Sequence, residues 1–400
     1  MKIVICWISQ VIGNNGGMEK VMINFSNEMA RRGHKVTLAY CTEFDGDFCS
    51  PVDENINITN LVKFMPGHKF ESVKKPLSFK VLREIIRVIC PTMARDMNVK
   101  LVIKQLAPAI SRILQIEKPD IIISLDPRTT TIIRGTDKHG CYPIISMSHF
   151  DADTILHYLS HLERDTLNNC DAVQALMPKD VKKFKTIWPD VAVVRIPNIV
   201  PQYELGGGLR ELCIVDVARL DKVQKRQHLL IETFSLLADQ FSDWTVEFWG
   251  DENGKSKYTD ELKELIRKYH LEGHVKLCGR TDDVLSVYRR ASIFAFPSAY
   301  EGFGLAMAEA MSAGLPVVAY RSCPAVNELV RDGETGLLVD DGVEALAEGL
   351  KKLMKNQELR ERMGRAAHES MKEFAPEKIW DQWEALMKDV ISKHKTKMER

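Results

Sequence analysis

Short apolar runs alternate with amphipathic helical stretches along this chain, and the alternation begins anew halfway through. Residues 4–8 form the first apolar run, residues 18–32 carry apolar side chains at helical spacing, and residues 35–40 form the next run. Strands that are apolar throughout are typical of parallel sheets covered by helices on both faces. The pattern therefore predicts an α/β protein with doubly wound sheets.

The expected strands fall into two sets. In the first half they lie at 4–8, 35–40, 120–125, 144–147, 171–176 and 191–196, and in the second at 212–217, 245–249, 275–277, 293–297 and 316–320. A glycine bend, Gly206–Gly207–Gly208, stands between the sets. Four hundred residues exceed what one hydrophobic core usually serves. We expect two Rossmann-like domains, 1–205 and 206–372, and a helix over 373–400 that packs back toward the first domain.

Glycine loops follow the expected strands in both halves of the chain. Open parallel sheets bind ligands beyond the carboxyl ends of their strands. We therefore expect the functional site in a deep cleft that the two domains face.

Composition narrows the class of function. Lys+Arg and Asp+Glu balance at 55 each, so no overall field favours nucleic acid as a partner. The nine Cys show no CxxC pair and no metal-ligand spacing, which indicates reduced thiols in a cytoplasmic protein. The opening apolar run is shorter than a signal-peptide core, and no stretch approaches the roughly 20 apolar residues that span a bilayer.

One loop carries the strongest chemical signal, residues 297–310, with one glutamate before a helix and a second inside it. Glu301 lies in a strand-to-helix connection where Gly302 and Gly304 let the backbone approach a ligand closely. Glu309 follows on the helix, where a carboxylate can accept hydrogen bonds from two vicinal ribose hydroxyls. Two surface glutamates on an ordinary amphipathic helix are the alternative interpretation.

The start of this helix offers backbone donors to an anion. The amides of Phe303, Gly304 and Leu305 are expected to be open there, and a helix N-terminus attracts a diphosphate and the charge that grows on it as a bond breaks. Such amides, together with basic side chains, can stand in for a divalent metal.

The stretch 297–310, followed by Gly314–Leu315–Pro316–Val317–Val318, resembles the signature of the family-four retaining glycosyltransferases. The resemblance extends over most of the chain and is strongest from 212 to 342. It implies a GT-B fold, a nucleotide sugar as donor substrate, no catalytic metal and no further cofactor. Glu301 then contacts the sugar, and Glu309 contacts the nucleotide.

Three further elements match this family. The segment 217–225 resembles the Arg/Lys pair that neutralises the donor diphosphate, here Arg219 and Lys225, with Lys222 and Arg226 as neighbouring cations. Gly16 and Gly17 match the glycine loop of the first domain, although a structural tight turn explains them as well. His149 stands where the family often carries a histidine that meets sugar or acceptor, but a lone histidine is commonly structural.

The resemblance implies a hexosyl- or N-acetylhexosaminyltransferase with retention of configuration, for which we favour a UDP-sugar as donor. Three alternatives stay open: a nucleotide-sugar epimerase of the same fold, a sugar phosphorylase, for which no pyridoxal-type lysine motif is evident, and a protein that binds a sugar nucleotide without turnover.

A basic segment points to the acceptor. From residue 63 to 118 there are 12 Lys/Arg against four acids, a balance of +8 in a neutral chain. Apolar residues at 81, 82, 85, 86 and 89 share helical spacing beside Lys80, Arg83 and Arg87. Such a surface suits the headgroups of an anionic membrane, and a core-facing helix with a solvated basic side is the alternative. We expect a saccharide or lipid-linked acceptor, an envelope glycan precursor, met by peripheral contact with the inner face of the membrane.

Overall fold

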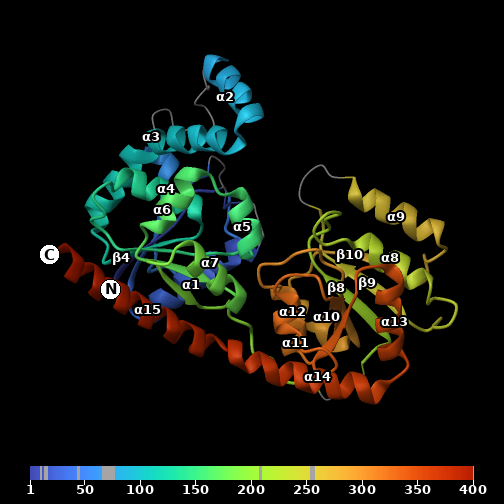
Figure 1. Ribbon diagram of the computed structural model, residues 1–400. Coiled ribbons are helices and arrows are strands. Elements are labelled where there is room, and N and C mark those ends of the chain that lie inside the picture. The colour runs from blue at the N-terminus through green and yellow to red at the C-terminus, as the bar shows by residue number, and fades with distance from the viewer. Residues whose placement is uncertain are drawn as a thin grey trace. The chain divides into compact units, whose positions relative to one another are not determined.

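The computed structural model describes residues 1–9, 11–12, 17–42, 46–64, 77–206, 210–252 and 257–399 (Figure 1). These residues form two compact units, each built on one parallel sheet. The first unit comprises Met1–Pro197 together with Trp380–Arg400, and the second comprises Asn198–Ile379. The division falls after Pro197, ahead of the glycine bend at 206–208.

The first unit contains a seven-stranded parallel sheet in the order β3-β2-β1-β4-β5-β6-β7. Its strands are β1 (Lys2–Trp7), β2 (Lys35–Tyr40), β3 (Asn57–Asn60), β4 (Ile121–Ser124), β5 (Ile144–Ser146), β6 (Ala172–Ala175) and β7 (Ala192–Arg195). Its helices are α1 (Gly17–Arg31), α2 (Leu77–Ile89), α3 (Pro91–Glu117), α4 (Pro127–Thr136), α5 (Ala152–Tyr158), α6 (His161–Asn168) and α7 (Pro178–Ile187), with a 3₁₀ turn η1 (Leu61–Phe64).

The second unit contains a six-stranded parallel sheet in the order β10-β9-β8-β11-β12-β13. Its strands are β8 (Cys213–Val217), β9 (Thr245–Trp249), β10 (Val275–Gly279), β11 (Ile293–Phe296), β12 (Val317–Tyr320) and β13 (Gly336–Val339). Its helices are α8 (Gln227–Ser235), α9 (Tyr258–Lys268), α10 (Val284–Arg290), α11 (Leu305–Ser312), α12 (Val326–Leu329), α13 (Val343–Met354) and α14 (Gln357–Met371), followed by the 3₁₀ turn η3 (Lys372–Phe374).

This architecture confirms the predicted fold class of two doubly wound Rossmann-like sheets. Strands β3 and β13 were not expected from the sequence. The four residues of β3 read Asn-Ile-Thr-Asn and lack an apolar run, and β13 is a four-residue strand that begins with glycine. Both are edge strands, and the apolar run of β13, Leu337–Val339, is only three residues long.

The final helix, α15 (Pro376–Met398), contributes most of its length to the first unit. Phe25 of α1 packs edge-on against Trp380 and Trp383, with ring centroids 5.6 and 5.0 Å apart. Arg32 donates to Glu384 at 3.1 Å, and the ring of His34 lies 2.7 Å from the same carboxylate. Aromatic packing and ion pairing thus attach the end of the chain to its first helix.

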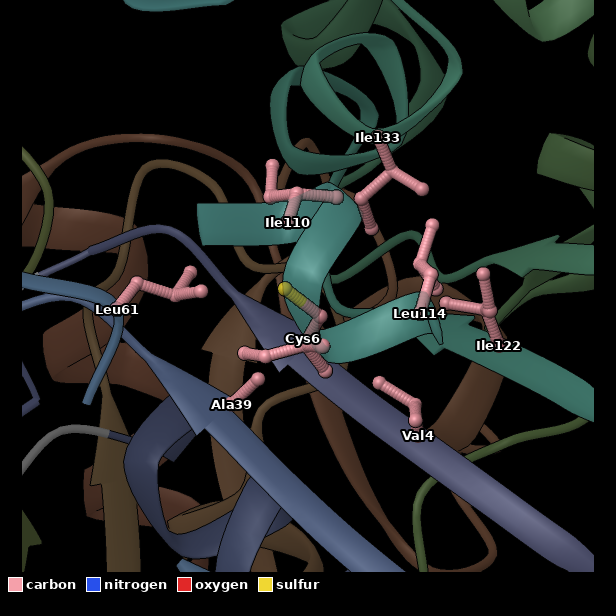
Figure 2. A pocket seen from close by; sticks show the side chains of 9 residues that line it. Val4, Cys6, Ala39, Leu61, Ile110, Leu114, Ile122 and Ile133 are labelled. Carbon is pink, nitrogen blue, oxygen red and sulfur yellow. The ribbon is translucent and has the colours of Figure 1, made fainter. Parts of the chain in front are cut away.

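A small cavity in the first unit is lined only by apolar side chains (Figure 2). They come from β1, β2, β4, η1, α3 and α4, and are Val4, Cys6, Ala39, Leu61, Ile110, Ile113, Leu114, Ile122 and Ile133. Burial raises the pKa of the Cys6 thiol, so this sulfur is an unreactive apolar group. The cavity is a packing defect of the core and offers a polar ligand no partner.

Close backbone contact positions the loop after β8. The amide of Ala218 donates to the Trp249 carbonyl at 3.0 Å, and that of Leu220 donates to the Asp251 carbonyl at 2.9 Å. Between them, Gly250 adopts a φ of +141°, and a Cβ placed on it would lie 2.0 Å from the carbonyl oxygen of Ala218. Only glycine fits where these two backbone segments cross, and this close contact fixes the position of the Arg219 backbone.

We expect Gly250→Ala to destabilise the second unit by several kcal/mol, because the new methyl group forces two backbone segments apart. Gly333→Ala is the matched control, since Gly333 also has a positive φ, of +77°, but its Cβ would meet nothing within 4 Å. That change should cost only about 1 kcal/mol. Urea denaturation of both variants measures the difference in unfolding free energy. Equal losses in the two variants would contradict the close contact between Gly250 and Ala218.

Candidate functional site

The second sheet reverses its strand order between β8 and β11, which lie side by side as parallel neighbours. Ligands of doubly wound sheets bind at such a switch point, beyond the carboxyl ends of the strands. The loop after β8 carries Arg219 and Lys225, and the loop after β11 carries Glu301. The topology therefore brings three sequence-predicted residues to one edge of one sheet.

The loop after β8 is held by its own polar groups. Asp221 accepts hydrogen bonds from the amides of Val223 and Gln224, at 3.0 and 2.7 Å. The guanidinium of Arg219 donates to Asp221 at 3.0 Å and to the Gln224 side chain at 3.2 Å. The Arg219 side chain is 43% exposed, so it is oriented by the loop and still open to an anion.

Gln224 joins this loop to the loop after β11. Its carbonyl accepts from the amide of Ala299 at 2.7 Å, and its side-chain amide donates to the carbonyl of Tyr300 at 3.2 Å. Gln224 does not stand out in the sequence, because a glutamine between a valine and a lysine carries no motif of its own. These bonds hold the two site loops at a fixed separation.

Lys225 and Glu301 form a buried ion pair, with Nζ 2.5 Å from Oε1. Their side chains are 16% and 8% exposed, and Nζ also lies 5.2 Å from the centroid of the Phe296 ring. The two neighbouring cations make contacts elsewhere. Lys222 pairs with Glu261 on the surface, and Arg226 donates to the Pro297 carbonyl at 2.8 Å. Lys225 is thus the lysine of this loop that reaches the glutamate.

Helix α11 starts at the same edge. Gly304 is its N-cap with a φ of +80°, a conformation that favours glycine. The first bond of the helix runs from the amide of Ala308 to the carbonyl of Gly304, so the amide of Leu305 has no acceptor inside α11. Phe303 is buried and packs edge-on against Phe374, which anchors the turn before the helix.

Glu309 lies half-buried on α11, one turn beyond the helix start. The hydroxyl of buried Tyr288 donates to its carboxylate at 3.4 Å and to the carbonyl of Ala306 at 3.1 Å. Burial, followed by the charge of Glu309, raises the pKa of Tyr288, so this hydroxyl stays a donor. Glu309 is therefore held in place by a residue from α10.

A further carboxylate lies beneath the ion pair. Asp216 is 2% exposed near the end of β8, and neither of its oxygens accepts a hydrogen bond of ordinary geometry from a described residue. Burial raises its pKa to about 7, and the charge of Glu301 adds to the rise while Lys225 and the nearby Gln227 amide oppose it. Sequence analysis missed this residue; its signal was a lone acid inside an apolar strand.

The remaining expected residues belong to the first unit. Gly17 is the first residue of α1, and Gly16 lies outside the described residues. His149 follows β5 and is half-buried; its Nε2 is buried without a hydrogen-bond partner among the residues that the structure describes. Burial lowers the pKa of His149 to about 4, so the ring is neutral at physiological pH.

No group of three or more His, Cys, Asp or Glu side chains in the described part of the chain is arranged to hold a metal ion. Among the described helices, none is long and apolar enough to span a bilayer.

Two parallel Rossmann-like sheets, with a cation–carboxylate pair and a glycine-capped helix at a switch point, define a GT-B type protein. Family models agree: residues 15–201 match the model described as Glycosyltransferase Family 4, and residues 208–370 match Glycosyl transferases group 1. The chain belongs to this family of glycosyltransferases.

Curated relatives give the same picture. An uncharacterized glycosyltransferase of Haemophilus influenzae is 26% identical over 94% of this chain and 97% of its own length. The N-acetyl-alpha-D-glucosaminyl L-malate synthase of Bacillus anthracis is 33% identical, over 47% of this chain and 48% of that protein.

Solved structures share the fold at low identity. TarM of S. aureus, in complex with Fondaparinux, alpha-GlcNAc-glycerol and UDP, is 17% identical with a TM-score of 0.72, covering 97% of this chain and 100% of that one. HepE of Anabaena, in complex with UDP and glucose, is 19% identical with a TM-score of 0.72, covering 97% and 99%.

The raised pKa of Asp216 predicts how stability depends on pH. In the unfolded chain this carboxyl ionises near 3.8, and in the folded chain near 7, so its contribution is fully present below 3.8 and is lost as pH rises through 7. Asp216→Asn removes that dependence. Relative to wild type, the variant should gain up to about 4 kcal/mol of unfolding free energy between pH 4 and 8.

Urea denaturation of the two proteins across this range gives the difference. Asp332→Asn serves as the control, because hydrogen bonds from the Leu338 amide and Arg321 outweigh burial and lower the pKa of Asp332, so nothing titrates there above pH 4. A wild-type minus Asp216→Asn difference that stays flat with pH would show that Asp216 is ionised throughout.

Proposed function

We propose that this protein is a retaining glycosyltransferase that moves a hexosyl or N-acetylhexosaminyl group from a UDP-sugar to a saccharide acceptor. The acceptor we infer is a lipid-linked envelope glycan precursor of lipopolysaccharide, O-antigen, capsule or teichoic type. The observation that carries the proposal is the meeting of Arg219, the Lys225–Glu301 pair and the start of α11 at one switch point.

The basic side chains and the helix start at this switch point suit the diphosphate of the donor. Arg219 presents an oriented planar fork, Lys225 a point charge, and the amides of Phe303, Gly304 and Leu305 a helix N-terminus. Together they stabilise the negative charge that develops on the leaving diphosphate. The UDP bound in TarM and HepE supports this choice of nucleotide.

The two glutamates take different parts of the donor. Glu309, held by Tyr288, accepts hydrogen bonds from the ribose hydroxyls. Glu301 accepts from hydroxyls of the sugar, and its pairing with Lys225 holds both side chains in position before the donor arrives. The ammonium of Lys225 then lies between the sugar-binding carboxylate and the diphosphate.

The configuration of the anomeric carbon is retained because the acceptor oxygen attacks that carbon on the face from which the diphosphate leaves. The bond from the anomeric carbon to the phosphate oxygen breaks, the acceptor oxygen bonds to the same face of that carbon, and the acceptor proton passes to the phosphate oxygen. No covalent sugar–enzyme bond is needed. The protein supplies orientation and electrostatic stabilisation.

The first unit handles the acceptor in this proposal. From the family resemblance we assign Gly16 and Gly17 a role in binding the donor diphosphate, and neutral His149 a hydrogen bond to sugar or acceptor. The basic segment from residue 63 to 118 favours an acceptor carried on an anionic membrane, on its inner, cytoplasmic face.

Product stereochemistry tests the proposal. With α-linked UDP-hexoses or UDP-N-acetylhexosamines and a saccharide acceptor, proton NMR should show an α-linked product, and transfer should persist in excess EDTA because protein groups neutralise the diphosphate. A β-linked product would overturn retention. Loss of transfer on chelation, restored by Mg²⁺ or Mn²⁺, would overturn the metal-free site, and interconversion of donors without acceptor would indicate an epimerase.

Substitution of two cations in the same loop distinguishes a specific contact with the diphosphate from a general effect of surface charge. Arg219→Ala should weaken UDP binding at least tenfold in calorimetry, because a charge-assisted contact to phosphate is lost. Lys222→Ala removes the same charge from a side chain that pairs with Glu261 on the surface, and should change affinity less than twofold. Similar losses in both variants would mean that only the net charge of the loop matters.

A further inference from the structure

Helix α2 exposes an apolar face that no described part of the chain covers. None of its 13 residues is buried. The exposed large side chains are Leu77, Val81, Leu82, Ile85, Val88 and Ile89, and Val88 is 86% exposed. Figure 1 shows α2, in blue-cyan, standing against α3 and away from the sheet of its own unit. An ordinary helix of a water-soluble unit buries such residues.

The side chains of α2 sort into three arcs around its axis. At 100° per residue, the six exposed apolar residues occupy one arc that also contains Ser78, and half-buried Phe79 and Ile86 follow on the next. The charged side chains fill the remainder, with Lys80, Arg83 and Arg87 against one acid, Glu84. Glu84 pairs with both arginines of the helix. A wide apolar face is thus flanked by a net basic one.

The segment around α2 is also net basic. Over residues 77–118, which span α2 and α3, there are eight basic and three acidic residues, a balance of +5 in a chain whose formal net charge is zero. At the start of α3, Met93 is also exposed and extends the apolar surface. A second copy of this chain would bring like charges together on such a face, whereas an anionic surface complements them.

We propose that α2 is the membrane-docking element of this protein, and that its apolar face enters the headgroup region of an anionic phospholipid bilayer. The 13-residue helix lies parallel to the membrane plane, with Leu77, Val81, Ile85 and Val88 toward the acyl chains and Lys80, Arg83 and Arg87 at the phosphates. This inference rests on the proposed function, for which it names the surface that meets a lipid-linked acceptor.

Vesicle flotation tests this assignment with the full chain. Wild type should float with vesicles of phosphatidylglycerol and phosphatidylcholine, bind pure phosphatidylcholine at least tenfold more weakly, and lose binding as salt is raised. Ile85→Ser combined with Val88→Ser leaves every charge in place and should lower binding to the anionic vesicles at least tenfold. Ile116→Ser combined with Leu236→Ser, two apolar residues exposed elsewhere, should bind like wild type.

Stabilisation by UDP in a thermal-shift assay shows that each variant is folded and keeps its donor site. Flotation of the α2 variant equal to wild type, or no flotation of wild type at low salt, would overturn the docking assignment. A wild-type dimer in sedimentation that the α2 variant abolishes, without vesicle binding, would assign the face to a second copy of the chain.

The proposed function fails by a different result. If UDP does not stabilise any of the proteins and UDP-sugars are not turned over, the donor site is wrong even where flotation behaves as expected. Flotation and donor turnover are thus separate readouts.

Discussion

The ion pair between Lys225 and Glu301 is the interaction on which the second unit's site depends. It joins the loop after β8 to the loop after β11, as do the hydrogen bonds that the backbone carbonyl and the side-chain amide of Gln224 make. A buried charge that loses its partner is strongly destabilising, so each of the two side chains requires the other. A site built this way exists before its ligand arrives, which reduces the ordering that binding would otherwise require.

Asp216 adds a second constraint to that pair. Its buried carboxyl lies near Lys225 and Glu301, and burial raises its pKa to about 7, so it is largely protonated below neutral pH. Two carboxylates beside one ammonium would give a net negative charge where we propose that the donor diphosphate binds. With Asp216 neutral, the pair stays balanced and Arg219 supplies the remaining positive charge.

The sequence predicted the fold well because buried parallel strands leave continuous apolar runs, and it missed β3 and β13, which lie at sheet edges. The family resemblance also assigned Lys225, Glu301 and Gly304 to the donor site, and in the structure Lys225 pairs with Glu301. Asp216 and Gln224 escaped because their importance comes from burial and from contacts 76 residues away along the chain. For α2 the sequence left two interpretations open, an exposed membrane-facing surface and a core-facing helix, because an apolar helical pattern fits both; the structure shows that none of its residues is buried.

The pairing of α15 with α1 has a consequence for biosynthesis. Residues from Trp380 onward belong to the same unit as the first strand, and Phe25 packs against two tryptophans that follow the whole second unit along the chain. The second unit can therefore complete its core during translation while the first still lacks a helix. Synthesis of the first unit therefore begins before that of the second and is completed after it, which reverses the usual order in which domains mature.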